Sequence, residues 1–111
     1  IRGDMAMRCP IPKAIRDELS EDPFMKTCIV AHECDGRVHF DHAFKYAGKR
    51  VNELWSILPL CRKHNMGVTK HVEALRRMNL RARIAHFKAF DDFQKKYPKS
   101  DLFATQPTIE I

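Results

Sequence analysis

Three cysteines and one histidine form the most informative chemical pattern in this 111-residue sequence. Cys61 and His64 are two residues apart in the spacing of a zinc half-site, and Cys34 precedes an Asp-Gly turn, where backbone amides can point at a thiolate. Cys28 is the expected fourth ligand. His32 competes for that position, but one intervening residue is too few for His32 and Cys34 to chelate together. The sequence therefore predicts one structural Zn²⁺ held by Cys28, Cys34, Cys61 and His64.

Two other interpretations of the cysteines stay open. The chain has four cysteines in total, so two disulfides would suit a small secreted protein, and free cysteines would suit a buried core. The six histidines that accompany them favour metal binding in a reducing cytoplasm. A second zinc is not placed by the pattern, and the residues left unassigned are Cys9, His32, His71 and His86.

A second set of chemically useful side chains lies between the two halves of the cysteine pattern and directly after the second half. His42 suits a general base, because imidazole exchanges protons near neutral pH. Asp41 and Asn65 offer oxygen ligands for Mg²⁺ or Mn²⁺. Neighbouring residues of a regular strand point to opposite faces, so the strand must end or bulge at Asp41 and His42 if both serve one site. His39 lies on the face of Asp41 and is the reserve base or ligand.

The charge balance favours a polyanionic partner. The chain has 20 lysines and arginines against 14 acidic residues, a formal net charge of +6, which suits DNA binding. The basic residues that flank the proposed site are the expected phosphate contacts, namely Lys45, Lys49, Arg50, Arg62 and Lys63. A second basic group is expected to be a solvated helix face rather than a DNA footprint, and it comprises Arg76, Arg77, Arg81 and Arg83.

The hydrophobic pattern predicts a small α+β fold in a single domain. We expect a β-hairpin over Thr27 to His42 that turns at Asp35-Gly36, a polar loop over 43–53, and a strand over Trp55 to Leu60. Helices are expected from Pro12 to Leu19, from Cys61 to Met78 with a disturbance at Gly67, and from Leu80 to Tyr97, where Leu80, Ile84, Phe87, Phe90 or Phe93, and Tyr97 form the apolar stripe.

The expected domain plan is a core over about 27–78, an N-terminal extension over 1–26, and a helix and tail over 79–111. Because the chain starts at Ile1, we expect it to be a fragment of a longer protein. No apolar run approaches the ~18 residues of a transmembrane helix.

The order of these motifs resembles the HNH (ββα-metal) nuclease family. The Asp41-His42 step matches the end of the family's first strand, and Cys61-Arg62-Lys63-His64-Asn65 matches the segment that opens its helix. The resemblance implies a zinc-stapled ββα-metal core that hydrolyses DNA with one divalent metal and His42 as base. The family's central asparagine falls near Ser56. Serine is a poor substitute for its loop-holding hydrogen bonds, and Asn52 is the alternative holder.

A closer resemblance is to the phage recombination-enhancement (Ref) proteins, which are RecA-dependent nucleases. It rests on Ile11-Pro12-Lys13, on the segment from Cys34 to Val38 with Asp41-His42-Ala43, and on the segment from Asn52 to Cys61. This resemblance implies action on DNA that carries a RecA filament, in the bacterial cytoplasm. The rival interpretation is a non-catalytic zinc module that binds DNA or a protein.

Overall fold

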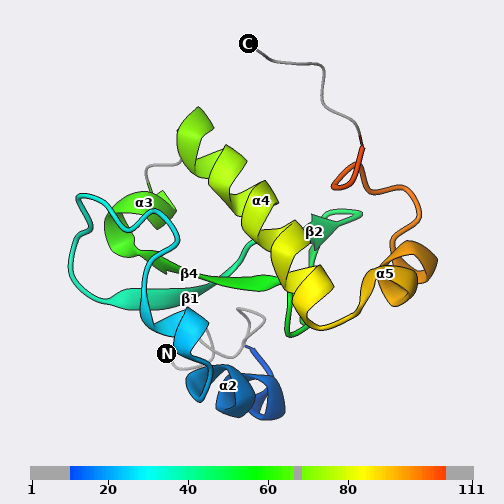
Figure 1. Cartoon of the computed structure of the whole chain (residues 1–111), viewed down its shortest axis with the longest axis horizontal. Helices are drawn as coiled ribbons and strands as arrows, with labels where there is room; N and C mark the ends of the chain where they lie inside the picture. Colours follow the sequence, from blue (N-terminus) through cyan, green and yellow to red (C-terminus); the bar gives the residue numbers. More distant parts are fainter. Residues whose placement is uncertain (1–10, 67–68, 105–111) are drawn as a thin grey trace, which may run out of the picture.

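The two longest strands of the protein lie side by side as an antiparallel pair (Figure 1). Strand β1 (Val38–His42) pairs with β4 (Ile57–Cys61) in a register that matches Val38 with Cys61 and His42 with Ile57. The computed structural model describes residues 11–66 and 69–104. The predictions for Cys9, for a helix disturbance at Gly67 and for the end of the tail after residue 104 lie outside these ranges.

A second, smaller sheet interrupts the predicted polar loop. Strands β2 (Lys45–Tyr46) and β3 (Lys49–Arg50) pair antiparallel around a two-residue turn. The turn residues Ala47 and Gly48 have φ angles of 53° and 78°, the conformation that a tight hairpin of this kind requires. The molecule is therefore α+β, as predicted, with two small sheets in place of one hairpin and one isolated strand.

The predicted hairpin over Thr27 to His42 is wrong. Its second strand exists as β1, but residues 27–37 form bends rather than a strand. Ala31 and Glu33 have φ angles of 54° and 52°, which break an extended chain. Strand β1 pairs instead with β4, whose five residues are all buried. An apolar strand that is buried along its length needs its backbone groups paired, and β1 satisfies them.

Five helices complete the described chain. They are α2 (Lys13–Ser20), the short 3₁₀ helix η1 (Pro23–Lys26), α3 (Arg62–Met66), α4 (Lys70–His86) and α5 (Phe90–Lys96). The long helix α4 starts at Thr69, whose side-chain oxygen accepts a hydrogen bond from the Val72 N–H at 3.2 Å. It contacts both β4 and α5, and in Figure 1 it crosses the β1–β4 pair diagonally.

The helix boundary expected between Met78 and Leu80 is also wrong. The Asn79 side chain donates to the Leu75 carbonyl at 2.8 Å, so this residue stays inside α4. The chain leaves the helix later, at Lys88, where φ is 53°. The predicted helix from Leu80 to Tyr97 is therefore the last part of α4 followed by α5.

The main core lies between α4, α5 and the β-strands. Phe44, Trp55 and Phe93 contact one another edge-on or tilted, with ring centroids 5.1 to 5.5 Å apart. Leu80, Ile84 and Phe93, all predicted for the apolar stripe, belong to this core. Phe87 and Tyr97, from the same predicted stripe, pack against it. Phe90 is exposed, so the choice that the sequence left open is decided for Phe93.

The arginines of α4 are not the solvated face that the sequence predicted. Arg83 is buried and pairs with Asp22 at 2.7 Å. Burial acts to raise the pKa of Asp22, but the hydrogen bonds from the Arg83 side chain and the Phe24 N–H, together with the nearby positive charge, lower it overall. Arg77 and Arg81 donate to the Leu102 carbonyl at 3.2 and 2.7 Å. Arg83 therefore ties α4 to the N-terminal segment at Asp22, and Arg77 and Arg81 tie it to the C-terminal segment at Leu102. Arg76 instead contacts Asp41 and Asn65. No helix in the described ranges is long and apolar enough to cross a membrane.

Candidate functional site

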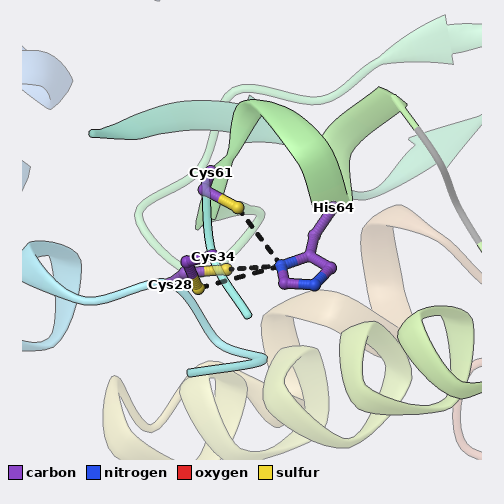
Figure 2. Close-up of side chains that lie close together, drawn as sticks. All are labelled: Cys28, Cys34, Cys61 and His64. Atoms are coloured by element: carbon purple, nitrogen blue, oxygen red, sulfur yellow. Dashed lines mark hydrogen bonds between the residues drawn. The ribbon is translucent and has the colours of Figure 1, made fainter. Parts of the chain in front are cut away.

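The four predicted zinc ligands converge on one point. Figure 2 shows Cys61 at the end of β4, His64 on α3, and Cys28 and Cys34 on the loop that passes beside them. The three sulfur atoms and the His64 Nδ1 atom all lie within 4.8 Å of one another. Cys28, Cys61 and His64 are buried, and Cys34 is exposed. His32 is not part of the cluster, so the preference for Cys28 over His32 is confirmed.

The distances in this cluster fit a tetrahedral metal ion. The His64 Nδ1 atom is 3.6 Å from the Cys28 sulfur, 3.8 Å from Cys34 and 3.2 Å from Cys61. A tetrahedral zinc with ~2.3 Å sulfur and ~2.0 Å nitrogen bonds places these atoms about 3.5 Å apart. The donor set is soft, as zinc sites prefer. The cluster can therefore hold a metal ion such as zinc. Cys28, Cys34 and Cys61 form no disulfide.

The backbone prepares Cys61 to be a thiolate ligand. Its sulfur accepts a hydrogen bond from the Asp35 N–H at 3.3 Å, from the turn that the Asp-Gly pattern predicted. Burial acts to raise the pKa of Cys61, but the backbone N–H groups of Asp35 and His64, followed by the Cys34 and Cys28 side chains, lower it to about 6. Desolvation and the neighbouring side chains of Cys28 and Cys61 raise the pKa of Cys34. One thiolate is therefore favoured before any metal binds.

A polar cleft of about 590 Å³ is lined by residues of β1, α3, α4 and the small sheet. It brings together the three residues that the sequence singled out for catalysis, Asp41, His42 and Asn65. Strand β1 ends at His42, and Asp41 and His42 both line the cleft although they are neighbours. The cleft lining also includes Lys45, Arg50, Glu73 and Arg76.

The imidazole of His42 is held by Asn52. The His42 Nε2 atom lies 2.8 Å from the Asn52 side-chain oxygen. An amide oxygen only accepts hydrogen bonds, so Nε2 carries the proton and donates it. The other ring nitrogen, Nδ1, is then the basic one in a neutral imidazole. This contact fixes both the orientation of the ring and the nitrogen that can accept a proton.

Ser56, not Asn52, holds the loop between the small sheet and β4. Its hydroxyl is fully buried, lies 2.7 Å from the Val51 carbonyl and 3.0 Å from the Glu53 carbonyl, and accepts from the Glu53 N–H at 2.9 Å. The expectation that serine is a poor holder of this loop is therefore wrong. A short hydroxyl suffices because the loop turns tightly around it, and Asn52 is left to contact His42.

The other predicted site residues are divided between several surfaces. His39 is exposed and lines a hollow with Arg16 and Ser20, not the cleft. Of the five predicted phosphate contacts, Lys45 and Arg50 line the cleft. The remaining three do not: Lys49 is exposed on β3, Arg62 is exposed on α3, and Lys63 lies 3.5 Å from Glu33 beside the cysteine cluster.

Arg76 is the cleft residue that sequence reasoning missed. Its Nη2 atom lies 3.0 Å from the Asp41 carboxylate and 3.5 Å from the Asn65 side-chain oxygen. The sequence grouped it with Arg77, Arg81 and Arg83 because all four fall on one helix. Asp41 is 35 positions earlier in the chain, and no spacing rule connects residues so far apart.

No protein-family model, curated protein or solved structure matches this chain.

Proposed function

We propose that this chain is a metal-dependent endodeoxyribonuclease of the HNH (ββα-metal) type. The observation that carries the proposal is the convergence of Asp41, His42 and Asn65 in one polar cleft. An antiparallel strand pair followed by a helix supplies all three residues, in agreement with the ββα architecture that the motifs imply. A base beside two oxygen ligands is the arrangement that phosphodiester hydrolysis needs.

His42 acts as the general base in this proposal. The Asn52 side-chain oxygen accepts a hydrogen bond from the Nε2–H group at 2.8 Å, so Nε2 keeps its proton. The Nδ1 atom of the neutral ring therefore takes a proton from the attacking water. A partner that fixes the tautomer also keeps the ring from rotating away from the water. Asn52 is therefore a positioning residue, and His42 is the residue that changes protonation state.

Asp41 and Asn65 hold the catalytic metal. Their side-chain oxygens already share one cationic nitrogen, Nη2 of Arg76, at 3.0 and 3.5 Å, so a positive ion fits between them. Carboxylate and amide oxygens are suitable ligands for Mg²⁺, which takes its remaining ligands from water and phosphate. When bound, Mg²⁺ or Mn²⁺ supplies charge neutralisation at the scissile phosphate and at the leaving oxygen.

The cysteine cluster has a structural role in this account. It is closed around its own four donor atoms, which is typical of structural zinc sites. His64 and Asn65 are consecutive residues of α3. Zinc bound to His64 therefore also fixes Asn65 in the cleft. A reducing compartment such as the bacterial cytoplasm keeps the thiolates available for the metal.

The net charge of +6 and the cleft residues Lys45 and Arg50 support DNA as the substrate. The resemblance to RecA-dependent phage nucleases extends the proposal to DNA that carries a RecA filament or a strand-exchange loop.

The second candidate is a non-catalytic zinc module that binds DNA or a protein. One observation favours it, the ion pair that Arg76 makes with Asp41, because an arginine in place of a metal would leave the cleft without a Lewis acid.

Plasmid cleavage separates the two functions. Zinc-loaded protein is incubated with supercoiled DNA in buffers with and without Mg²⁺, and with and without a RecA filament. The nuclease proposal predicts nicked or linear DNA only when Mg²⁺ is present. Intact plasmid in every condition, including with RecA, would favour the binding module.

A further inference from the structure

Arg76 occupies an unusual place in the cleft. It comes from the middle of α4, and its guanidinium reaches across to β1 and α3 to contact Asp41 and Asn65. Its side chain is 18% exposed. Its buried Nε atom has no hydrogen-bond partner among the described residues, and Glu73 is 3.8 Å from Nη1. Because arginine has five N–H donors, the Arg76 guanidinium still has donors that these contacts do not use.

Arg83 shows what a permanent arginine contact looks like on the same helix. Its guanidinium is 2.7 Å from Asp22 and lies over the rings of Phe24 and Phe87, 4.2 and 4.8 Å from their centroids. Both rings attract the cation, and the arginine is buried among them. Arg76 has no such ring contact within residues 11–66 and 69–104, and its partners face an open cleft. Arg76 can therefore leave its partner where Arg83 cannot.

A divalent ion and the guanidinium compete for the same two oxygens. Two cations a few ångströms apart repel each other strongly in a partly buried site. Binding of Mg²⁺ to Asp41 and Asn65 must therefore displace Arg76. Because α4 is anchored by core contacts at Leu80 and Ile84, the displaced guanidinium remains at the wall of the cleft. Its planar fork suits the oxygens of a phosphate group.

We propose that Arg76 is a positioning residue that exchanges partners. It holds Asp41 and Asn65 when the cleft has no divalent metal, and it binds a phosphate group of the DNA once the metal has taken those oxygens. This inference rests on the proposed nuclease function. It also explains how an arginine in the metal position is compatible with catalysis, since the ion pair is the resting arrangement of the site and DNA gives the arginine its second partner.

The first test is Mn²⁺ binding by the zinc-loaded full chain without DNA, followed by electron paramagnetic resonance. Arg76→Gln and Arg76→Ala remove the competing cation, so both should bind Mn²⁺ about tenfold more tightly than wild type, the effect of ~1.4 kcal/mol. Lys70→Ala is the matched control, because it removes one positive charge from an exposed position of the same helix. It should leave Mn²⁺ affinity within about twofold of wild type. Zinc content and circular dichroism verify that each variant is folded.

The second test is duplex binding by fluorescence anisotropy, with Ca²⁺ as a divalent ion or with no divalent ion. Arg76→Gln should weaken binding about five- to tenfold in Ca²⁺, in line with loss of a charged hydrogen bond, and should change it little without a divalent ion. If wild type binds Mn²⁺ but neither variant binds it more tightly, the exchange is overturned and the nuclease proposal stands. Equal weakening with and without Ca²⁺ also overturns the exchange. If wild type binds no Mn²⁺ at all, both proposals fail.

Discussion

The cysteine cluster and the Asp41–His42 cleft both take a residue from helix α3, yet they are built in opposite ways. The cluster is closed, with four soft donor atoms within 4.8 Å of one another. The cleft is an open space of about 590 Å³ lined mostly by polar residues, and its two metal-ligand candidates contact an arginine. The cluster supplies a full set of four ligands from the chain. The cleft supplies only two candidate ligands, Asp41 and Asn65, which leaves coordination positions for water and substrate.

Under the proposed function, the two regions have different roles. A site with four protein ligands has no open coordination position and stabilises the fold. A site with two oxygen ligands keeps positions for water and substrate. The link between them is α3, where His64 faces the cluster and Asn65 faces the cleft. The closed site should therefore dominate stability, and the open site should dominate activity.

The largest expected effect is on the closed site. Cys61→Ser should release zinc and lower the melting temperature by more than ~10 °C, because loss of several kcal/mol of metal-coupled folding energy shifts a domain of this size by at least that much. Zinc analysis and calorimetry measure the two effects. Met66→Ala is the control, since it changes an exposed residue of the same helix. Full zinc content and an unchanged melting temperature in Cys61→Ser would contradict the assignment.

Asp41→Asn should break the open site and leave the closed site intact. The substitution keeps the shape of the side chain but removes its charge, so Mn²⁺ binding in the cleft should be lost. Cleavage should fall on the order of 10²-fold or more, because the metal contributes several kcal/mol to the transition state. Zinc content should not change. Loss of zinc in this variant would show that the two regions are one coupled unit.

Asn52→Ala and Ser56→Ala should separate positioning from folding. Asn52→Ala frees the His42 ring, and cleavage should fall ~10–100-fold, as expected when the partner of a catalytic or ligating histidine is removed. Mn²⁺ affinity and melting temperature should stay close to wild type. Ser56→Ala leaves buried backbone groups of the loop unpaired and should cost about 1–3 kcal/mol of stability. Equal loss of stability in both variants would contradict this division.

The smallest expected effect is on the salt dependence of DNA binding. Lys45→Ala and Arg50→Ala should each reduce the slope of log affinity against log salt by about 0.9, the value for one phosphate contact on duplex DNA. Lys63→Ala should leave the slope unchanged, because Lys63 lies beside Glu33 on the side of the cysteine cluster. A change in slope for Lys63→Ala alone would show that DNA binds beside the cysteine cluster and not at the cleft.

Local patterns predicted much of the closed site. The two-residue spacing of Cys61 and His64, and the Asp-Gly pair after Cys34, identified three members of the cluster from neighbouring residues. Cys28 was predicted as the fourth because the spacing of His32 and Cys34 is poor for chelation. Strand β1 and the helix start after Cys61 were also predicted from neighbouring residues. The end of α4 was not predicted. Lys88 ends the helix with a positive φ, and lysine is not a residue type that signals this conformation.

The open site was predictable only in part. The Asp41-His42 step and Asn65 were found through the resemblance to the HNH motif order, and the structure brings them into one cleft. The pairing of β1 with β4 instead of residues 27–33, and the arrival of Arg76 from α4, depend on contacts between distant parts of the chain. Ser56 was misjudged for the same reason, because its hydrogen bonds exist only once the loop has closed around it.

Single-turnover cleavage by His42→Ala, compared with wild type and His39→Ala, tests the nuclease account most directly. All three proteins are loaded with zinc and assayed on DNA with Mg²⁺, with RecA filaments as a second substrate. Loss of the general base should slow His42→Ala by ~10²–10⁴-fold, while its zinc content and DNA affinity stay near wild type. His39→Ala should cleave at the wild-type rate, because His39 lies outside the cleft. Wild-type cleavage by His42→Ala would contradict the account.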